Sequence, residues 1–256
     1  MIKSLFSAFL MYSRIPMPRV EWKEENRRYA LGFFPLVGAV IGWLFTGWRQ
    51  LCQTLGLWSM LFAAVSVLIP LAVTGGIHMD GFMDVTDARN SFGDREKKLE
   101  IMSDPHVGSF AVIWGCVYLI VQAGLFSQAY NMRTCSMVSA VFVLSRSLSA
   151  FGAICFKSAK SQGSLQSFKK PAHKGITLAM TGAAFLFSAG MMVRADFTVG
   201  AACVVTAAAV LVFCRRWAYK ELGGFTGDVC GWFLQLCEIF AIAVIVIGER
   251  IATVVR

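Results

Sequence analysis

Three aspartates, Asp80, Asp84 and Asp87, have a spacing that would place their side chains on one face of a helix. Like charges on one face repel each other, and a cation bound between them would remove that repulsion. Hard divalent ions such as Mg²⁺ bind oxygen ligands of this kind, often one or two carboxylates together with substrate phosphates. The plainer interpretation is a solvated acidic face with one aspartate as an N-cap, but no lysine lies among the three. The spacing therefore predicts a metal site.

The stretch around these aspartates holds seven of the fifteen acidic residues of the chain. Asp94, Glu96 and Glu100 alternate with basic residues, which is typical of an exposed helix, and Asp94 is its predicted N-cap. Asp104 precedes a proline and ends that helix; a role in the site and a purely structural role are equally open for it. His78 is a candidate for proton transfer, and orienting a ligand or capping a turn is the alternative.

A second polar segment, Gly223-Gly-Phe-Thr-Gly227, precedes Asp228 at the start of an apolar window. Backbone amides of a glycine-rich turn at a helix start suit phosphate binding. The candidate phosphate-binding residues are Gly223, Gly224, Thr226 and Gly227. Asp228 is a candidate metal ligand, and capping the helix, whose dipole favours an acid at this end, is the competing explanation.

Two charged residues, Arg146 and Glu238, fall deep inside apolar windows, where an uncompensated charge is expensive. Each is the obvious partner of the other, so an internal ion pair is one interpretation. The functional interpretation has Arg146 facing a substrate phosphate, with Glu238 orienting it or binding the metal. Near the N-terminus, the prolines of Arg14-Ile-Pro-Met-Pro18 stiffen a basic segment. Arg14 is a candidate to contact either anionic headgroups or a substrate phosphate.

Hydrophobic residues make up 57% of the 256 residues and charged residues 15%, against about 45–50% and 25% in soluble domains. Several apolar windows are long enough to cross the hydrocarbon core as helices. They predict an all-α, polytopic membrane helix bundle, a single integral membrane catalytic domain over residues 1–256, with cytoplasmic motif loops. The seven or so transmembrane helices are expected near 29–48, 55–73, 108–128, 134–156, 176–193, 197–214 and 229–247.

Three local patterns add to this arrangement. Ile2, Leu5 and Phe9 recur at helical spacing, which favours an N-terminal helix lying in the membrane interface over a cleaved secretory signal. Gly75 and Gly76 predict a bend at the membrane edge, because glycine adopts conformations that other residues avoid. The eight cysteines show no CxxC pair and no clustering with histidine, so neither a disulfide framework nor a zinc site is expected.

The basic residues alternate between the predicted loops. Segments 1–28, 74–107, 157–174 and 215–228 hold eighteen of the 24 lysines and arginines, while the opposite loops and the C-terminus hold five. The positive-inside rule then places the N-terminus and the three long loops in the cytoplasm. The acidic stretch and the glycine-rich segment fall on one side, as a shared site requires. The net charge of +9 has this explanation, and no basic patch interleaved with exposed aromatics indicates nucleic acid binding.

Clustered aspartates, a phosphate-binding turn and an intramembrane arginine suggest phosphoryl chemistry on a membrane-associated substrate. Asp84-Val-Thr-Asp87-Ala-Arg89 partly matches the pattern of CDP-alcohol phosphotransferases, which make lipid head groups. Asp80-Gly-Phe-Met-Asp84 matches the N/DxxxD motif of intramembrane prenyltransferases, but no second such cluster is present. A cation-coupled transporter would spread carboxylates through several spans at the bilayer midplane, whereas here only Glu238 lies deep.

Three ordered motifs fit a further family better. Gly75-Gly-Ile-His-Met-Asp-Gly-Phe-Met-Asp-Val-Thr-Asp87, Leu99-Glu-Ile-Met-Ser-Asp-Pro-His-Val-Gly108 and Gly223-Gly-Phe-Thr-Gly-Asp228 resemble those of the cobalamin synthase family, the adenosylcobinamide-GDP ribazoletransferases. Arg14-Ile-Pro-Met-Pro18 and Phe34-Pro-Leu-Val-Gly38 are similar to that family's opening segments. The resemblance covers nearly the whole chain with the motifs in the same order.

This resemblance implies an inner-membrane enzyme of cobalamin biosynthesis that uses Mg²⁺. A hydroxyl of α-ribazole, or of its 5′-phosphate, attacks adenosylcobinamide-GDP, and GMP leaves. Metal ligation is then expected from Asp80, Asp84 and Asp87, while Asp104 and Asp228 match family-motif positions that complete the metal shell or position the nucleophile. Either an aspartate or His78 takes the hydroxyl proton. The expected partners besides the substrates are the lipid bilayer, a second copy in a homo-oligomer and other corrinoid-assembly enzymes, with no nucleic acid.

Overall fold

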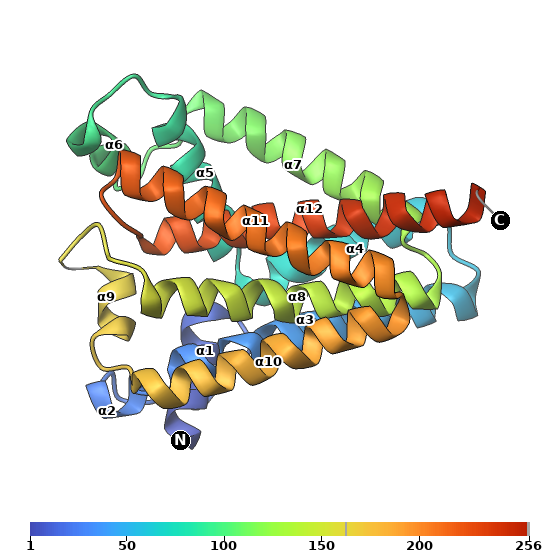
Figure 1. Cartoon of the computed structure of the whole chain (residues 1–256), viewed down its shortest axis with the longest axis horizontal. Coiled ribbons are helices and arrows are strands. Elements are labelled where there is room, and N and C mark those ends of the chain that lie inside the picture. The colour runs from blue at the N-terminus through green and yellow to red at the C-terminus, as the bar shows by residue number, and fades with distance from the viewer. Residues whose placement is uncertain (162, 255–256) are drawn as a thin grey trace.

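The computed structural model describes residues 1–161 and 163–254, and within them the chain forms twelve helices and no strand (Figure 1). Six of these helices are long and apolar enough to cross a membrane, which confirms the predicted polytopic bundle. They are α3 (Ala30–Leu55), α7 (Ser109–Gln128), α8 (Met132–Cys155), α10 (Lys174–Ala195), α11 (Phe197–Glu221) and α12 (Gly227–Val254).

The predicted span at 55–73 is a shorter helix that ends in a sharp bend. Helix α4 (Ser59–Thr74) and helix α5 (Ile77–Asn90) are long and apolar enough to span a membrane only when they are taken together. The pair is bent by 94°. The bend falls on Gly75 and Gly76, whose φ values of 64° and 79° lie in the left-handed region that favours glycine. The expected bend at Gly75 and Gly76 is confirmed, and it turns α5 away from the direction of α4.

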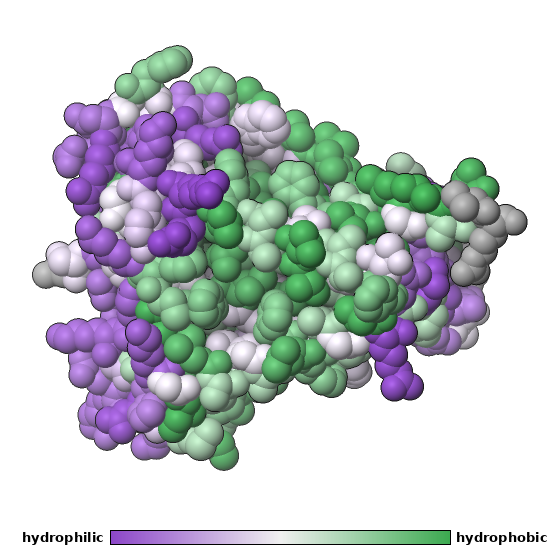
Figure 2. Space-filling view, in the orientation of Figure 1, coloured by the Kyte–Doolittle hydropathy of each residue, from purple (hydrophilic) through white to green (hydrophobic). Residues whose placement is uncertain are grey.

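Four short helices gather at the polar end of the bundle, where α5 also lies. They are α1 (Ile2–Tyr12), α2 (Glu24–Arg27), α6 (Arg95–Ile101) and α9 (Ser164–Lys169). The predicted N-terminal helix is therefore present as α1. Figure 2 shows hydrophilic residues covering this end, a broad hydrophobic surface along the middle, and a smaller hydrophilic group near the other end. The N-terminus lies toward the polar end and the C-terminus at the far end (Figure 1).

Close helix packing brings the inner parts of the bundle together. On α3, Gly38 faces the backbone of α8, and a Cβ added there would lie 2.2 Å from the carbonyl oxygen of Phe142. Small residues at helix contacts let backbones approach closely, which is how helices associate in membranes. Nearer the far end, Phe45 packs against Phe62 and Phe126 with ring centroids 5.6 Å and 5.2 Å apart. This rigid interior fixes the ends of the helices that carry the polar residues.

Candidate active site

Helix α5 carries the three spaced aspartates and packs directly on the start of α12. Gly81 makes this contact possible, because a Cβ added to it would lie 2.9 Å from the backbone of Asp228. Asp80, Asp87 and Asp228 consequently surround Asp84 closely enough for their charges to act on it. Burial and then these three carboxylates raise the pKa of Asp84 to about 7. The predicted shared face is present, and the first turn of α12 contributes a fourth acid, Asp228, to it.

The acidic face lies at the level where the spanning helices begin, outside the apolar part of the bundle. Asp228 is the second residue of α12. Asp87 contacts the first residues of α7: its two carboxylate oxygens accept hydrogen bonds from the backbone amides of Gly108, at 2.6 Å, and Ala111, at 2.9 Å. A negative charge is favourable at a helix N-terminus. Asp87 therefore joins α5 to α7 with both of its oxygens.

Asp80 and Asp84 differ from Asp87 in having no partner within the described residues. Neither forms an ion pair or a hydrogen bond there. Among these residues, no group of three His, Cys, Asp or Glu side chains is arranged to hold a metal ion by itself. Mg²⁺ needs fewer protein ligands than that, since one or two carboxylates and the phosphates of a substrate commonly complete its shell. The donor set therefore fits an ion shared with a phosphorylated substrate.

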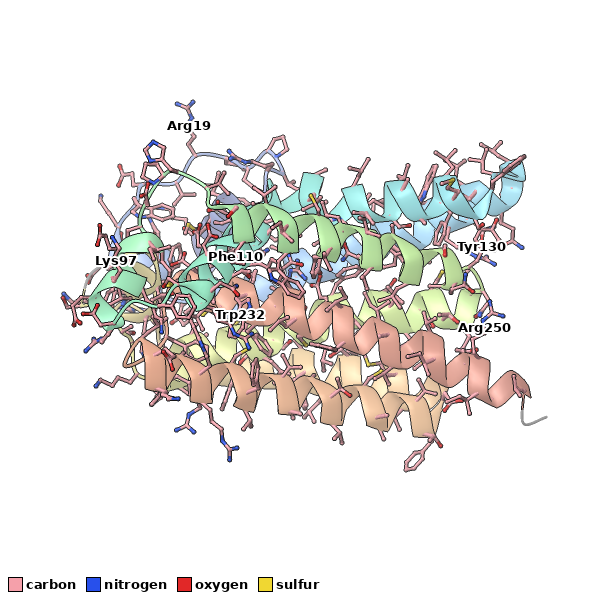
Figure 3. The ribbon with its side chains drawn as sticks, turned by 90° about the horizontal axis from the view of Figure 1, so that it is seen from above. Arg19, Lys97, Phe110, Tyr130, Trp232 and Arg250 are labelled. Carbon is pink, nitrogen blue, oxygen red and sulfur yellow. The ribbon has the colours of Figure 1, made fainter. Side chains whose placement is uncertain are left out.

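Three cavities meet at this acidic face. The first, called the His78 cavity, has a volume of about 240 Å³ and is lined by both Asp80 and Asp228. The second, of about 610 Å³, brings Arg14 to the same Asp80. The third, of about 140 Å³, is lined by Lys160 and Asp228. Figure 3 shows that Arg19 and Lys97 lie at this end of the molecule, opposite Tyr130 and Arg250. Arg14 therefore lies near the acidic face, and its contact with a phosphate or a headgroup stays a prediction.

His78 lies in the wall of the first cavity, buried to 6% exposure. Its ring centroid is 5.4 Å from that of Phe34 and 6.4 Å from that of Tyr12. Neither ring nitrogen has a hydrogen-bond partner among the residues that the structure describes. Burial, and then the positive charge of Arg146, hold the pKa of His78 well below its ordinary value. A neutral imidazole in such surroundings is a hydrogen-bonding group more than a proton acceptor.

The glycine-rich segment forms a turn whose amides are only partly available. Gly224 donates to the carbonyl of Ala218 at 3.1 Å, and Phe225 donates to that of Lys157 at 2.7 Å. Two of the candidate phosphate-binding residues, Thr226 and Gly227, line the third cavity together with Lys160. Lys160 was not predicted as a site residue. Its position in a basic loop was the only feature of the sequence that indicated such a role. Gly223 and Gly224 hold the turn, and Thr226 and Gly227 face the cavity.

Asp104 does not join the acidic face. It lies in the exposed loop after α6, where its Oδ1 accepts hydrogen bonds from the backbone amide of His106 at 2.9 Å and from the ring Nδ1 at 2.7 Å. These bonds lower the pKa of Asp104. At the other end of the same helix, the predicted N-cap Asp94 is confirmed, since its side chain accepts from the amide of Lys97 at 2.9 Å.

Arg146 and Glu238 form an ion pair inside the bundle, with a distance of 2.7 Å between Arg146 Nη1 and Glu238 Oε1. Both side chains are 1% exposed. Ser145 also donates to Glu238 at 3.0 Å, and Arg146 donates to the carbonyl of Phe142 at 3.0 Å. The expected partnership of the two residues is confirmed. Of the two interpretations drawn from the sequence, the internal ion pair describes this contact, and Glu238 is not brought to the aspartates.

Comparisons with known proteins agree over nearly the whole chain. Residues 4–246 match the family model of cobalamin-5-phosphate synthase. A relative from Lachnoclostridium phytofermentans is 39% identical over 98% of this chain and 95% of its own length. Relatives from Geobacillus kaustophilus, 33% identical over 89% of both chains, and Clostridium botulinum, 29% identical over 93% and 95%, are similar. All three are named adenosylcobinamide-GDP ribazoletransferase. No solved structure matches the chain.

Proposed function

The chain belongs to the cobalamin-5-phosphate synthase family, and we propose on this premise how its acidic face serves the ribazole transfer. The enzyme moves the adenosylcobinamide-phosphate group from adenosylcobinamide-GDP to α-ribazole or its 5′-phosphate. This transfer is the last assembly step of cobalamin biosynthesis. One observation carries the assignment of the site: Asp80, which has no partner in the described residues, and Asp228 lie where three cavities meet, close enough to Asp84 for their charges to act on it.

The transfer forms one bond to phosphorus and breaks another. A hydroxyl oxygen of the acceptor attacks the phosphorus on the cobinamide side of the diphosphate. The bond from that phosphorus to the bridging oxygen breaks, and GMP leaves with this oxygen. The hydroxyl proton must go to a base. Positioning and electrostatic stabilisation dominate such reactions, because the protein has little covalent chemistry to perform.

Asp80 and Asp228 are the ligands that we assign to Mg²⁺, because both line the His78 cavity and Asp80 also faces the cavity of Arg14. When bound, the ion would neutralise charge on the diphosphate and hold it for in-line displacement. Arg14 and Lys160 lie on the two sides of this pair, in the second and third cavities. They supply positive charge on either side of a substrate whose phosphates lie at the aspartates.

Asp84 is the residue that we assign as the proton acceptor. A general base works best when its pKa is near the operating pH, and burial, followed by the charges of the neighbouring carboxylates, raises the pKa of Asp84 to that range. His78 has the opposite environment, since burial and the charge of Arg146 disfavour its protonated form. Two groups whose pKa values are shifted in opposite directions have different roles in a site. Asp84 accepts the proton, and His78 binds substrate in its neutral form.

The polar end faces the cytoplasm in our assignment, with the chain in the inner membrane. Eighteen of the 24 basic residues fall in the four segments at this end, and positive charge is retained on the cytoplasmic side. Both substrates would then reach the site from the cytoplasm or along the membrane surface. Association with a second copy, or with other enzymes of corrinoid assembly, stays a prediction.

Turnover by the purified, detergent-solubilised protein tests this assignment. With Mg²⁺ present, GMP is expected to appear from adenosylcobinamide-GDP only when α-ribazole is added. Chelation of the metal with EDTA should stop GMP release, and added Mg²⁺ should restore it. GMP release that continues at full rate in EDTA would refute the metal assignment. Release of CMP from a CDP-alcohol, with none of GMP, would indicate lipid head-group synthesis instead.

A further inference from the structure

The His78 cavity has two chemically different ends. Asp80 and Asp228 form one end. Apolar side chains from three helices line much of the rest, among them Tyr12 of α1, Phe34 of α3 and Ala153 of α8. The rings of Tyr12 and Phe34 lie 4.3 Å apart, which makes a continuous aromatic wall. A ligand that fills this cavity therefore needs a flat apolar part and a polar part next to it.

The position of His78 indicates that the flat part of the ligand carries an atom that can form a hydrogen bond. Its side chain is 94% buried, and both ring nitrogens lack a partner in the described residues. A buried polar atom without a partner is unfavourable, and nearly all such atoms in proteins are hydrogen-bonded. Because His78 lines an open cavity, a bound molecule can supply the missing partner. A neutral imidazole offers one donor and one acceptor for this purpose.

We propose that the His78 cavity binds the aromatic base of the acceptor nucleoside, with His78 donating a hydrogen bond to its free ring nitrogen. This proposal rests on the proposed function, which supplies α-ribazole as the acceptor. The base lies against Tyr12 and Phe34, and the sugar extends to the acidic end of the cavity. The attacking hydroxyl is thereby delivered to Asp80 and Asp228, the two carboxylates assigned to the metal, whose charges also act on Asp84.

The two ends of the cavity distinguish the acceptor base from the guanine of the other substrate. Guanine exposes several acceptors and donors along its edges, including O6, N7 and the exocyclic amine. An apolar wall with His78 as its unpartnered group would leave most of them unsatisfied, which strongly disfavours binding. A base of the benzimidazole type has an apolar six-membered edge and a single free ring nitrogen. The one hydrogen bond that this nitrogen can accept is the one that His78 can donate.

The volume supports a subsite for part of a ligand. The cavity measures about 240 Å³, below the 300–1,000 Å³ that is typical of a pocket for a whole drug-sized molecule. A corrinoid is far too large for it. The adjoining cavity of about 610 Å³, which shares Asp80, remains for phosphates and other parts of the substrates.

Equilibrium binding without the donor substrate tests the subsite separately from turnover. Isothermal titration of the purified full-length protein with α-ribazole should show binding. His78→Ala should weaken that binding by about tenfold or more, because a hydrogen bond to a buried group is lost. Ala153→Leu should weaken it similarly by filling the cavity. His173→Asn is the matched control: His173 caps α10 outside the cavity, asparagine also caps helices, and binding should not change.

Steady-state kinetics give a second readout on the same variants. His78→Ala and Ala153→Leu should raise the KM for α-ribazole by a similar factor, with the KM for adenosylcobinamide-GDP within about twofold. A rise confined to the KM of the GDP substrate would assign the cavity to the donor and overturn the proposal. A loss of kcat with unchanged α-ribazole binding would overturn it as well, since His78 would then act in the chemical step.

The proposed function and the proposed subsite would be refuted by different results. If the wild-type protein binds α-ribazole and both variants weaken it, the subsite stands even where no GMP is released, and only the proposed function fails. If GMP is released normally and neither variant changes α-ribazole binding, the function stands and the subsite is wrong. Displacement of α-ribazole by guanosine at equal concentration would also refute the choice of base.

Discussion

The molecule contains two buried or partly buried sets of charged residues, and they are built in opposite ways. Inside the bundle, Glu238 has an arginine partner at 2.7 Å and a second hydrogen bond from Ser145. At the polar end, Asp80 and Asp84 form no ion pair or hydrogen bond within the described residues, and the charges that act on Asp84 are those of three other carboxylates. The interior pair balances its two charges within the protein, although the buried Nε of Arg146 has no hydrogen-bond partner among these residues. The charges of the acidic face are not balanced in this way, and a bound cation would balance them.

This difference gives a criterion that separates structural from functional charged residues in a membrane protein. Ionisable residues within the bilayer region are expected to be functional, and by that rule Arg146 and Glu238 would rank first. Yet their opposite charges are paired with each other, which is what a structural ion pair requires. The carboxylates without a partner in the described residues lie at the polar end of the bundle, where Asp80 lines two cavities. The burial of a charged side chain is therefore a weak indicator of function by itself. A buried or crowded charge that lacks a partner of opposite charge is a stronger one.

Replacement of Asp84 by asparagine should give the largest effect. Asp84→Asn keeps the shape of the side chain but removes the proton acceptor, so kcat should fall by about 10²–10⁴-fold, the usual contribution of a general base. Because the change also relieves repulsion among the carboxylates, the metal-free protein should unfold at the same or a higher temperature. GMP release and thermal unfolding in detergent measure the two quantities.

Asp94→Asn is the matched control for this change. Asp94 lies in the same acidic stretch but caps α6, and asparagine is about as good an N-cap as aspartate. Its turnover should remain near that of the wild type. If Asp84→Asn turned over at a similar rate, the contrast between unpartnered and partnered carboxylates would lose its functional meaning.

Separation of the interior pair should lower stability more than any other change discussed here. Glu238→Leu leaves Arg146 buried without its counter-charge, so the free energy of unfolding should fall by about 3–5 kcal/mol. Replacing both residues, as Arg146→Met with Glu238→Leu, removes the unpaired charge and should recover most of that loss. Thermal unfolding of the single and double variants in detergent measures this difference.

Turnover of the double variant decides between the two interpretations of Arg146. A structural pair predicts GMP release within a few-fold of the wild type once stability is recovered. A stable double variant that has lost activity would show that Arg146 contacts a substrate phosphate, as the functional interpretation of the sequence holds. The interior pair would then be functional, and the contrast with the acidic face would not hold.

The sequence was sufficient for the parts of the fold that depend on hydropathy. The windows at 108–128 and 134–156 differ from α7 and α8 by at most two residues at either end, because the apolar length that spans a membrane is itself fixed by the bilayer. The bend at Gly75 was also foreseeable, since few other residues adopt its backbone conformation. The spacing of the aspartates placed them on one face because a helix has a fixed period.

What could not be predicted depends on residues distant in the chain. The partners of Asp87 are amides 21 and 24 residues later, and no local pattern distinguishes it from Asp84. The burial of His78 depends on Tyr12 and Phe34, which come from two other helices. Lys160 lies beside Asp228 only because the loop before α9 pairs with the turn before α12. Roles within the acidic face are thus set by tertiary contacts.

Asp87 lies on the same helix face as Asp80 and Asp84 but has hydrogen-bond partners. We expect its replacement to have the smallest effect on turnover and stability. Asp87→Asn removes one of two acceptors at the start of α7, so the free energy of unfolding should fall by about 1 kcal/mol, as for other helix caps. Its turnover should fall much less than that of Asp84→Asn. Asp94→Asn is again the control, because Asp94 caps α6 through a single oxygen, which asparagine can replace. An Asp87→Asn protein of unchanged stability that is as inactive as Asp84→Asn would place Asp87 in the chemistry of the site, and the functional carboxylates would then extend along the whole face of α5.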